Sequence, residues 1–331
     1  MPNIFDVARK AGVSKSTVSR VINSNGPVDE ETRMNVERAM KELNYSPDFF
    51  ARGMRMSKTK TIGLIIPEYT NPFFPVWYKA FEKHISPDGY VCVIGITEND
   101  PEREMRVIRD MVNRRVDAII IWLYNETPAN TKYLVGLQPS IPVVFMDPWI
   151  RQKGATIIST DGFNAVAGAV DHLAAKGLKN IAIVKGPGHL DVTGERYKGY
   201  MAGLKRNGLK MSDDFVYEGD FYAESGYNAA RHFMSLKTKP QAVITVTDDM
   251  AVGVLKYCHE RKIKVPQQLS IIGFNNQPIT ELVEPGITTL EIPVVPYAEL
   301  TYSFLMEFMN GKRQEPVKKL FECTLIKRKS T

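Results

Sequence analysis

The sequence predicts an α/β protein in which a small all-helical head precedes a larger two-lobed core of parallel sheets. Only helical periodicities occur in the first 46 residues. From Thr61 onward, short β-branched runs alternate with helix-length segments, which is typical of βαβ units. A chain of 331 residues is also too long for one ordinary core. We therefore expect a head at 1–46, a hinge segment at 47–60 and a core at 61–331.

Three short helices are expected in the head. Asn3, Ser14 and Asp29 can each cap the start of a helix, because their side-chain oxygens can accept from free backbone N–H groups. Gly12 can end the first helix, since glycine tolerates positive φ. Apolar residues recur at helical spacing in each segment, and in the second helix these are Val18, Val21 and Ile22.

The second helix has a polar face that suits contact with DNA. Two helices joined by a tight glycine turn predict a helix-turn-helix, whose second helix fits the major groove. Arg20 can donate two hydrogen bonds to a guanine, and Lys15 and Ser16 can reach base edges from the helix start. Ser14 and Thr17 are placed to donate to phosphates. The alternative is a small helical bundle whose cations merely face solvent.

Positive charge is concentrated near the N-terminus. Residues 1–61 hold eleven lysines and arginines against seven acidic residues, whereas the remaining residues hold 32 against 30. A basic head on a nearly neutral body indicates a polyanion as the partner of the head.

The segment "SPDFFARGMRMSKTK" is a cationic connector between the head and the core. Asp48 can cap a helix of about two turns there, but isolated helices of that length are marginal in water. Gly53 destabilises such a helix by about another 1 kcal/mol relative to alanine. We expect this hinge segment to be ordered only when a partner holds it.

The composition excludes several classes of protein. Cys92, Cys258 and Cys323 lie far apart without CxxC spacing, which argues against a disulfide framework or a zinc site. No apolar run reaches the ~18 residues of a membrane span, and the N-terminus lacks an apolar signal core. We therefore expect a cytoplasmic protein that needs neither a metal nor a cofactor.

The core is expected to hold two lobes of parallel strands. Buried runs such as "TIGLIIP", "YVCVIGI", "IPVVFM", "NIAIVKG" and "LSIIGF" are separated by helical stretches. Ligands of open α/β sheets bind at the carboxyl ends of the strands, so a cleft between the lobes is the natural site.

Several motifs, in order, resemble one family along essentially the whole chain. They include "DVARKAGVSKSTVSRVIN", "TIGLIIPEYTNPFF", "ERYKGYMAGLKRNGL", "TDDMAVGVL" and "VPQQLSIIGF". In these motifs, the sequence is similar to the lac repressor and purine repressor family of bacterial transcription regulators. This resemblance implies a helix-turn-helix head, a hinge helix and a core resembling periplasmic binding proteins. It also implies a repressor that binds a near-palindromic DNA operator as a homodimer.

The resemblance assigns DNA contacts to the head and the hinge. The base-reading positions of the recognition helix fall on Lys15, Ser16 and Arg20. Asn23 and Thr32 would help to anchor the head on the DNA backbone. Met54 stands where the family inserts a leucine wedge between base steps, and Ala51 stands where it packs a small residue against the groove. An exposed linker methionine is the alternative for Met54.

Effector contacts are implied for the core. By the same resemblance, the effector-binding positions are Asn71, Phe73, Phe74, Asp147, Arg196, Phe221, Thr247 and Asn275. Arginine suits the task because its planar fork makes two parallel hydrogen bonds to hydroxyls or a carboxylate. Phe73 and Phe74 could instead begin the core face of the next helix, and Arg196 could be a surface cation.

Some effector positions depart from the family pattern. Asn275 stands where many relatives carry a carboxylate, and Thr247 stands where many carry asparagine. Polar positions used by relatives after "GPG" fall on Leu190 and Val192. Because an amide replaces an anion near Arg196, we expect a site more hospitable to an anionic ligand than a neutral-sugar pocket. The ligand classes considered are sugars, sugar phosphates and purines.

Two other classes of protein share features with this sequence. An enzyme is not indicated, because "GPG" is only a fragment of a nucleotide-binding loop and the five histidines are scattered. The adjacent Asp248 and Asp249 could suggest acid/base chemistry, although a helix N-cap is the more ordinary explanation. A solute-binding transport protein would share the core but not the DNA-reading head.

Overall fold

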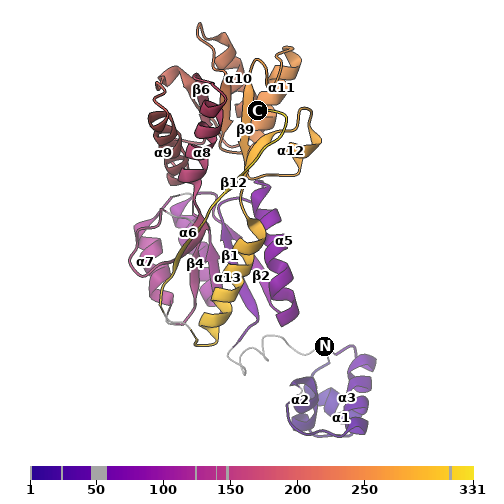
Figure 1. The fold of residues 1–331 in the computed structure, drawn as a ribbon. Helices are drawn as coiled ribbons and strands as arrows, with labels where there is room; N and C mark the ends of the chain where they lie inside the picture. The colour runs from indigo at the N-terminus through magenta and orange to yellow at the C-terminus, as the bar shows by residue number, and fades with distance from the viewer. Residues whose placement is uncertain are drawn as a thin grey trace. The chain divides into compact units, whose positions relative to one another are not determined.

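A computed structural model describes residues 2–23, 25–45, 58–123, 125–138, 140–146, 149–312 and 315–331. The chain divides into two compact units, one covering residues 1–60 and the other residues 61–331. Figure 1 labels the helices and strands of both units. Each unit is described separately below.

The head unit contains three helices around a small apolar core. They are α1 (Ile4–Ala11), α2 (Lys15–Asn23) and α3 (Glu30–Glu42). Val7, Val18 and Val36 come from different helices, and each is fully buried. The helical periodicity of the sequence therefore identified the residues that hold the three helices together.

The predicted caps of the head form as expected. Asn3 Oδ1 accepts hydrogen bonds from the backbone of Phe5 and Asp6, and the Asp6 carboxylate in turn accepts from the Asn3 N–H. Gly12 ends α1 in the left-handed region, with φ of 69°. Asp29 Oδ1 accepts from the N–H of Thr32 at 2.8 Å and so caps α3.

The first lobe of the core is a sheet of six described strands in the order β11-β5-β4-β3-β1-β2, with every pairing parallel. Its strands are β1 (Thr61–Ile66), β2 (Val91–Ile96), β3 (Ala118–Ile121), β4 (Val143–Phe145), β5 (Thr156–Thr160) and β11 (Lys318–Phe321). Its helices are α5 (Phe73–Ile85), α6 (Pro101–Asn113), α7 (Pro128–Leu137) and α13 (Val294–Met309).

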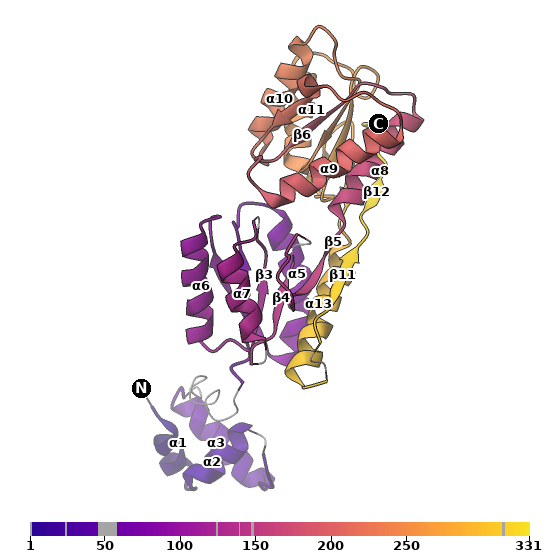
Figure 2. The ribbon, with the colours of Figure 1, turned by 90° about the vertical axis from the view of Figure 1, so that its left-hand side faces the viewer.

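Helices cover both faces of this sheet, α5 and α13 on one and α6 and α7 on the other (Figure 2). Successive side chains of a strand point to opposite faces of the sheet, so neighbouring residues of one strand pack against different helices. Ile62 and Leu64 of β1 pack with Trp77 of α5, whereas Ile65 packs with Ile108 of α6. Continuous apolar strands are needed here because both faces are buried.

The second lobe is a sheet of six described strands in the order β12-β10-β9-β8-β6-β7. Its strands are β6 (Ile181–Lys185), β7 (Val216–Glu218), β8 (Ala242–Thr245), β9 (Ser270–Phe274), β10 (Thr288–Glu291) and β12 (Thr324–Ile326). Its helices are α8 (Gly162–Ala175), α9 (Asp191–Arg206), α10 (Ala223–Ser235), α11 (Asp248–Glu260) and the short α12 (Ile279–Leu282). Two short 3-10 helices, η1 (Ser86–Asp88) and η2 (Asp213–Phe215), complete the described elements.

The C-terminal part of the chain differs from the expected pattern. Parallel strands were expected throughout, but β12 runs antiparallel to β10. The neighbouring strand β11 joins the first lobe instead, so the last strands are shared between the two sheets (Figure 2). A strand can add antiparallel at a sheet edge without a crossover helix, and the residues between β11 and β12 leave no room for one. The chain passes between the lobes after β5, after β10 and after β11.

Glu104 is an acidic side chain buried where α6 meets α7. Only 6% of its surface is exposed, and its Oε1 accepts a hydrogen bond from Asn130 Nδ2 at 2.7 Å. Burial raises the pKa of Glu104 to about 7. Between about pH 4.5 and 7, the folded protein therefore keeps a proton that the unfolded chain releases. The free energy of unfolding falls as the pH rises through this window.

We expect Glu104→Gln to remove this pH dependence, because the glutamine amide can still accept from Asn130 but carries no buried charge. At pH 8 the free energy of unfolding should exceed that of the wild type by on the order of 2 kcal/mol, with little difference at pH 5. Urea denaturation at both pH values measures the effect. Glu102→Gln on the same helix, whose side chain is 91% exposed, is the matched control. The same response in both variants would contradict the assignment.

Within the part of the chain that the structure describes, every helix is too short or too polar to span a bilayer.

Candidate functional sites

The exposed face of α2 carries the residues expected to read DNA bases. Lys15, Ser16 and Arg20 are exposed, whereas Val18 on the other side of the helix is fully buried. Lys15 Nζ lies 4.7 Å from the centroid of the Phe5 ring, a cation–π distance. Phe5 is itself 58% exposed. The start of α2 and the first turn of α1 therefore present a cation and an aromatic ring on one accessible surface.

Hydroxyl groups gather at the N-terminus of α2. Ser14 Oγ accepts a hydrogen bond from the Thr17 N–H at 3.1 Å and so caps the helix. The same oxygen lies 2.7 Å from Ser16 Oγ and 2.9 Å from Thr17 Oγ1. Hydroxyls beside the positive end of a helix dipole are well placed to meet phosphate oxygens.

Other predicted DNA contacts are less fully described. Thr32 lies in the first turn of α3, where its N–H binds Asp29, and Asn23 is the last residue of α2. Ala51 and Met54, predicted to act in the hinge segment, lie outside the described residues.

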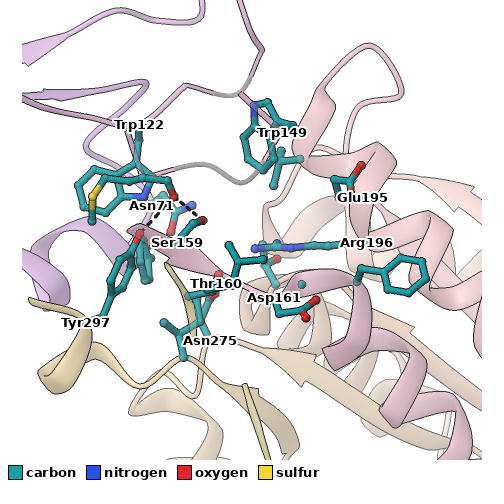
Figure 3. Close-up of a pocket in the computed structure, with 18 of the residues that line it drawn as sticks. Asn71, Trp122, Trp149, Ser159, Thr160, Asp161, Glu195, Arg196, Asn275 and Tyr297 are labelled. Carbon is teal, nitrogen blue, oxygen red and sulfur yellow. Dashed lines mark hydrogen bonds between the residues drawn. The ribbon is translucent and has the colours of Figure 1, made fainter. Parts of the chain in front are cut away.

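A cavity of about 250 Å³ lies between the two lobes of the core (Figure 3). Many of the residues that line it follow the carboxyl ends of strands in both sheets, as the rule for open α/β sheets predicts, and others come from helices α9 and α13. The cavity brings together Asn71, Phe73, Phe74, Arg196, Phe221, Thr247 and Asn275, all of which the sequence predicted as effector contacts. Asp147, the remaining predicted contact, lies outside the described residues.

Arg196 extends from α9 into the cavity (Figure 3). Its guanidinium stacks on the Phe274 ring at 4.1 Å, and Nη1 donates a hydrogen bond to the Val246 carbonyl at 2.7 Å. These contacts fix the plane of the Arg196 guanidinium before any ligand binds. Gly162 leaves room for the Arg196 stem, because a Cβ at residue 162 would lie 3.3 Å from Arg196 Cγ.

Aromatic rings form much of the cavity wall. Phe73, Phe74 and Trp122 pack edge to face in the first lobe, with ring centroids 5.6–6.1 Å apart. Trp149 also lines the cavity, and its indole N–H is buried without a hydrogen-bond partner among the described residues. Apolar walls with a few fixed polar groups are typical of small-molecule sites.

Phe221 closes the second-lobe side of the cavity in a strained conformation. Its φ is 76°, in the left-handed region that non-glycine residues rarely adopt. The ring lies against Gly186, where an added Cβ would come within 2.2 Å of Phe221 Cε1. Glycine at residue 186 therefore lets the ring take its place in the wall. Backbone strain of this kind is concentrated at functional sites.

The two described acidic residues of the cavity, Asp161 and Glu195, have protein partners. Asp161 caps α8 by accepting from the Asn164 N–H at 2.9 Å, and its other oxygen accepts from Asn164 Nδ2. Glu195 forms an ion pair with Lys198 at 2.9 Å. Lys318 lies on the rim, is exposed, and has no ion pair with a described residue. Among the described lining residues, Arg196 and Lys318 are the two cations.

Hydrogen bonds join the two lobes across the cleft. The Tyr222 hydroxyl donates to Glu68 Oε2 and lies 2.9 Å from Thr70 Oγ1. The pairing with the Glu68 carboxylate raises the pKa of Tyr222. Elsewhere, Asp191 exchanges two hydrogen bonds with the loop after β3, accepting from the Glu126 N–H at 3.0 Å and donating its own N–H to Asn125 Oδ1 at 2.9 Å. These contacts hold the lobes in one relative arrangement.

The sequence did not identify every residue of the cavity. Trp122 and Thr160 follow or end buried strands, so the rule about carboxyl strand ends could have found them. Tyr297 could not be found in this way because it comes from α13, far along the chain. Its hydroxyl donates to the carbonyls of Met146 and Ile158, which places the ring beside the first sheet. Leu190 and Val192 are buried, and Val192 lines the cavity.

Comparisons with known proteins place both units in one family. Residues 3–48 match the model of bacterial regulatory proteins of the lacI family, and residues 170–331 match a periplasmic binding protein-like domain. The chain is 36% identical to the ribose operon repressor of Escherichia coli, over 92% of each chain. It is 32% identical to the transcriptional repressor PurR of Erwinia tasmaniensis, over 100% of this chain and 97% of that one. A structure of the lac repressor dimer bound to operator and the anti-inducer ONPF is similar at a TM-score of 0.90 and 25% identity, covering 100% and 99% of the two chains.

The fold and the two sites define a class of protein in which a DNA-binding head is joined to a ligand-binding core. The chain belongs to the lacI family of bacterial regulatory proteins. It is therefore a DNA-binding transcription regulator and not an enzyme, and the predicted fold class and family are confirmed. The match of the head also distinguishes it from a solute-binding transport protein.

Proposed function

We propose that this protein is a cytoplasmic homodimeric repressor whose affinity for a near-palindromic operator is set by a small effector in the cavity between the lobes. The observation that carries the proposal is the convergence of the predicted effector contacts on one cavity. In a dimer, two heads would read two half-sites related by two-fold symmetry. Affinity for the operator should fall steeply with salt, because lysines and arginines displace counterions from phosphates.

The contacts of the head divide into two groups. Lys15, Ser16 and Arg20 would read base edges, because they share the exposed face of α2. Contacts to the DNA backbone would come from Ser14, Thr17, Asn23 and Thr32. In the hinge segment, Met54 would wedge between base steps at the operator centre, beside Ala51.

Arg20→Ala is expected to weaken operator binding by about 1–3 kcal/mol and to relax the preference at one base position. The physical reason is the loss of a bidentate contact to a base edge, which a methyl group cannot replace. The operator is first obtained by selecting fragments from a random-sequence DNA library. Fluorescence anisotropy on that operator and on its single-base variants then measures the change.

Arg38→Ala is the matched control for this experiment. It removes an exposed arginine from α3, so the net charge changes equally while α2 stays intact. We expect its base preferences to equal those of the wild type. If Arg20→Ala kept the same preferences as well, the assignment of α2 as the recognition helix would be wrong.

The effector that the cavity suits best is a sugar carrying an anionic group. Aromatic walls can pack against the apolar faces of a sugar ring, and the Arg196 fork can bind hydroxyls or an anion. The carboxylates of Asp161 and Glu195 are occupied by protein partners, whereas Lys318 has none among the described residues. The ribose operon repressor, 36% identical over most of the chain, also points to a sugar.

Isothermal titration calorimetry with D-ribose, D-ribose 5-phosphate and hypoxanthine tests this ligand class. The sugar phosphate is expected to bind about tenfold more tightly than the neutral sugar, since charge-assisted hydrogen bonds are stronger. Equal or tighter binding of D-ribose would overturn the preference for an anion. Binding of hypoxanthine alone would overturn the sugar class.

Linkage between the two sites supplies the mechanism. A ligand can change DNA affinity only through its differential affinity for two arrangements of the lobes. A hinge segment that folds only when it contacts the hinge segment of the second subunit and DNA would respond to such a change, because its helix has marginal stability in isolation. The hydrogen bonds of Tyr222 and Asp191 across the cleft would break if the lobes opened.

A further inference from the structure

A strained turn presents Asn275 to the cavity. Asn275 and Asn276 follow β9 with φ of 111° and 54°, both in the region that non-glycine residues rarely adopt. The Asn275 side chain lines the cavity, where no described residue accepts from its amide or donates to it (Figure 3). The turn therefore holds a free amide ready for a ligand at the expense of backbone strain, and neighbouring groups must stabilise it.

The buried carboxylate of Asp248 supplies that stabilisation. Asp248 is the first residue of α11, and none of its surface is exposed. Its Oδ2 accepts a hydrogen bond from the Gln277 N–H at 2.7 Å, immediately after the two strained residues. Its Oδ1 accepts from Thr289 Oγ1 at 2.5 Å. One carboxylate thus joins α11, the turn after β9 and strand β10.

Gly273 provides the space for this carboxylate. A Cβ at residue 273 would lie 2.2 Å from Asp248 Oδ1, closer than any side chain permits. Gly273 is also followed by Phe274, on which Arg196 stacks, and then by Asn275. The packing around Asp248 therefore continues directly into the ligand-facing surface.

Helix capping does not explain why a buried aspartate lies at residue 248. The N-cap of α11 is Thr247, whose Oγ1 accepts from the Met250 N–H, so the expectation that the acidic pair caps this helix is wrong. Asp248 makes its bonds to neutral groups, and Asp249 and Arg328 are the charged groups that act on it from nearby. Burial raises the pKa of Asp248 to about 7. A buried carboxylate of this kind costs stability, which favours a role beyond packing.

We propose that Asp248 is a positioning residue for effector binding, because its carboxylate holds the turn at 275–277 in the conformation that turns the Asn275 amide into the cavity. This inference rests on the proposed effector site. It assigns a role to a residue that does not itself line the cavity.

Hydrogen–deuterium exchange of the full-length protein tests the first half of the proposal without any ligand. In Asp248→Ala, the amides of 275–277 should exchange at least about tenfold faster than in the wild type, because Gln277 loses its acceptor. Asp248→Asn should restore protection, since an asparagine oxygen can accept from Gln277 while its amide donates to Thr289. Asp249→Asn is the matched control, because the Asp249 carboxylate accepts from the Gln277 side chain and not from the Gln277 N–H. Unchanged exchange in Asp248→Ala would overturn the proposal.

Calorimetry with D-ribose and D-ribose 5-phosphate tests the second half. The probe that binds the wild type should bind Asp248→Ala about tenfold more weakly, and Asp248→Asn with nearly wild-type affinity. Wild-type affinity in Asp248→Ala, together with fast exchange of the turn, would overturn the positioning role. If neither probe binds the wild type, the proposed ligand class fails, while the exchange result still decides whether Asp248 holds the turn.

Thr289→Val provides a second test if Asp248→Ala does not fold. This variant removes the hydrogen bond to Asp248 and also the one that Thr289 Oγ1 accepts from the Asn276 N–H at 3.3 Å, while it preserves the volume of the side chain. We expect faster exchange at 275–277 and weaker binding of the same probe, each by a smaller factor than for alanine at 248. Wild-type behaviour in both measurements would count against the proposal.

Discussion

Replacing Arg196 by alanine is expected to weaken effector binding about a hundredfold, because a charge-assisted bidentate contact and a stacking surface are lost together. Phe274 and the Val246 carbonyl already hold the guanidinium in place, so little side-chain entropy is lost when the effector binds. Arg196→Lys should recover only part of the affinity, since a lysine has the charge but not the fork. Calorimetry with D-ribose and D-ribose 5-phosphate measures these differences.

Arg206→Ala is the matched control for Arg196. Arg206 lies in the last turn of the same helix, where its guanidinium pairs with Asp171 away from the cavity. We expect Arg206→Ala to leave effector affinity unchanged, because exposed ion pairs contribute about 0–1 kcal/mol to stability and none to this site. Wild-type affinity in Arg196→Ala, with circular dichroism showing an intact fold, would remove Arg196 from the site.

Gly253→Ala is expected to lower the free energy of unfolding by about 3 kcal/mol or more, because overpacking against rigid backbone cannot relax. A Cβ at residue 253 would lie 1.8 Å from the Ala223 carbonyl oxygen of α10. The contact is reciprocal, since a Cβ at Gly226 of α10 would lie 2.0 Å from the Met250 carbonyl oxygen of α11. The two helices must separate to accept either methyl group. Thermal or urea denaturation measures the loss.

Gly168→Ala in α8 is the control for this prediction. It is an exposed helical glycine, and an added Cβ would meet no atom within 4 Å. Alanine should therefore stabilise the protein by about 0.5–1 kcal/mol through helix propensity. Similar effects of the two substitutions would show that helix propensity, and not the close approach of α10 and α11, governs both sites. Since Ala223 begins α10 directly after Phe221 and Tyr222, Gly253→Ala should also disturb the wall of the cavity.

Local patterns were sufficient to predict the head. The capping residues Asn3 and Asp29 and the glycine that ends α1 all act within a few residues of their own positions. A cap or an apolar stripe is a short-range feature, so it can be read without knowing the rest of the fold. The same holds for the apolar strands of the core, whose burial on both faces requires continuous runs.

The cavity was predicted only in part, because its residues come from distant parts of the chain. Motif resemblance indicated Arg196, Phe221 and Asn275, which line it. Tyr297 lines the same cavity from α13, and no short-range pattern connects it to the others. The crossing of the last strands, which places β11 in one sheet and β12 in the other, likewise depends on pairing between residues far apart in sequence.

The sequence by itself determined the helices of the head, the two-lobed α/β class, the family and seven of the residues that line the cavity. Only the tertiary structure decided what those residues do to one another. It placed the Arg196 fork on Phe274, the Phe221 ring over Gly186 and the carboxylate of Asp248 under the turn that carries Asn275. Secondary structure follows from interactions over a few residues, whereas a binding site depends on distances across the fold that only the packed core fixes.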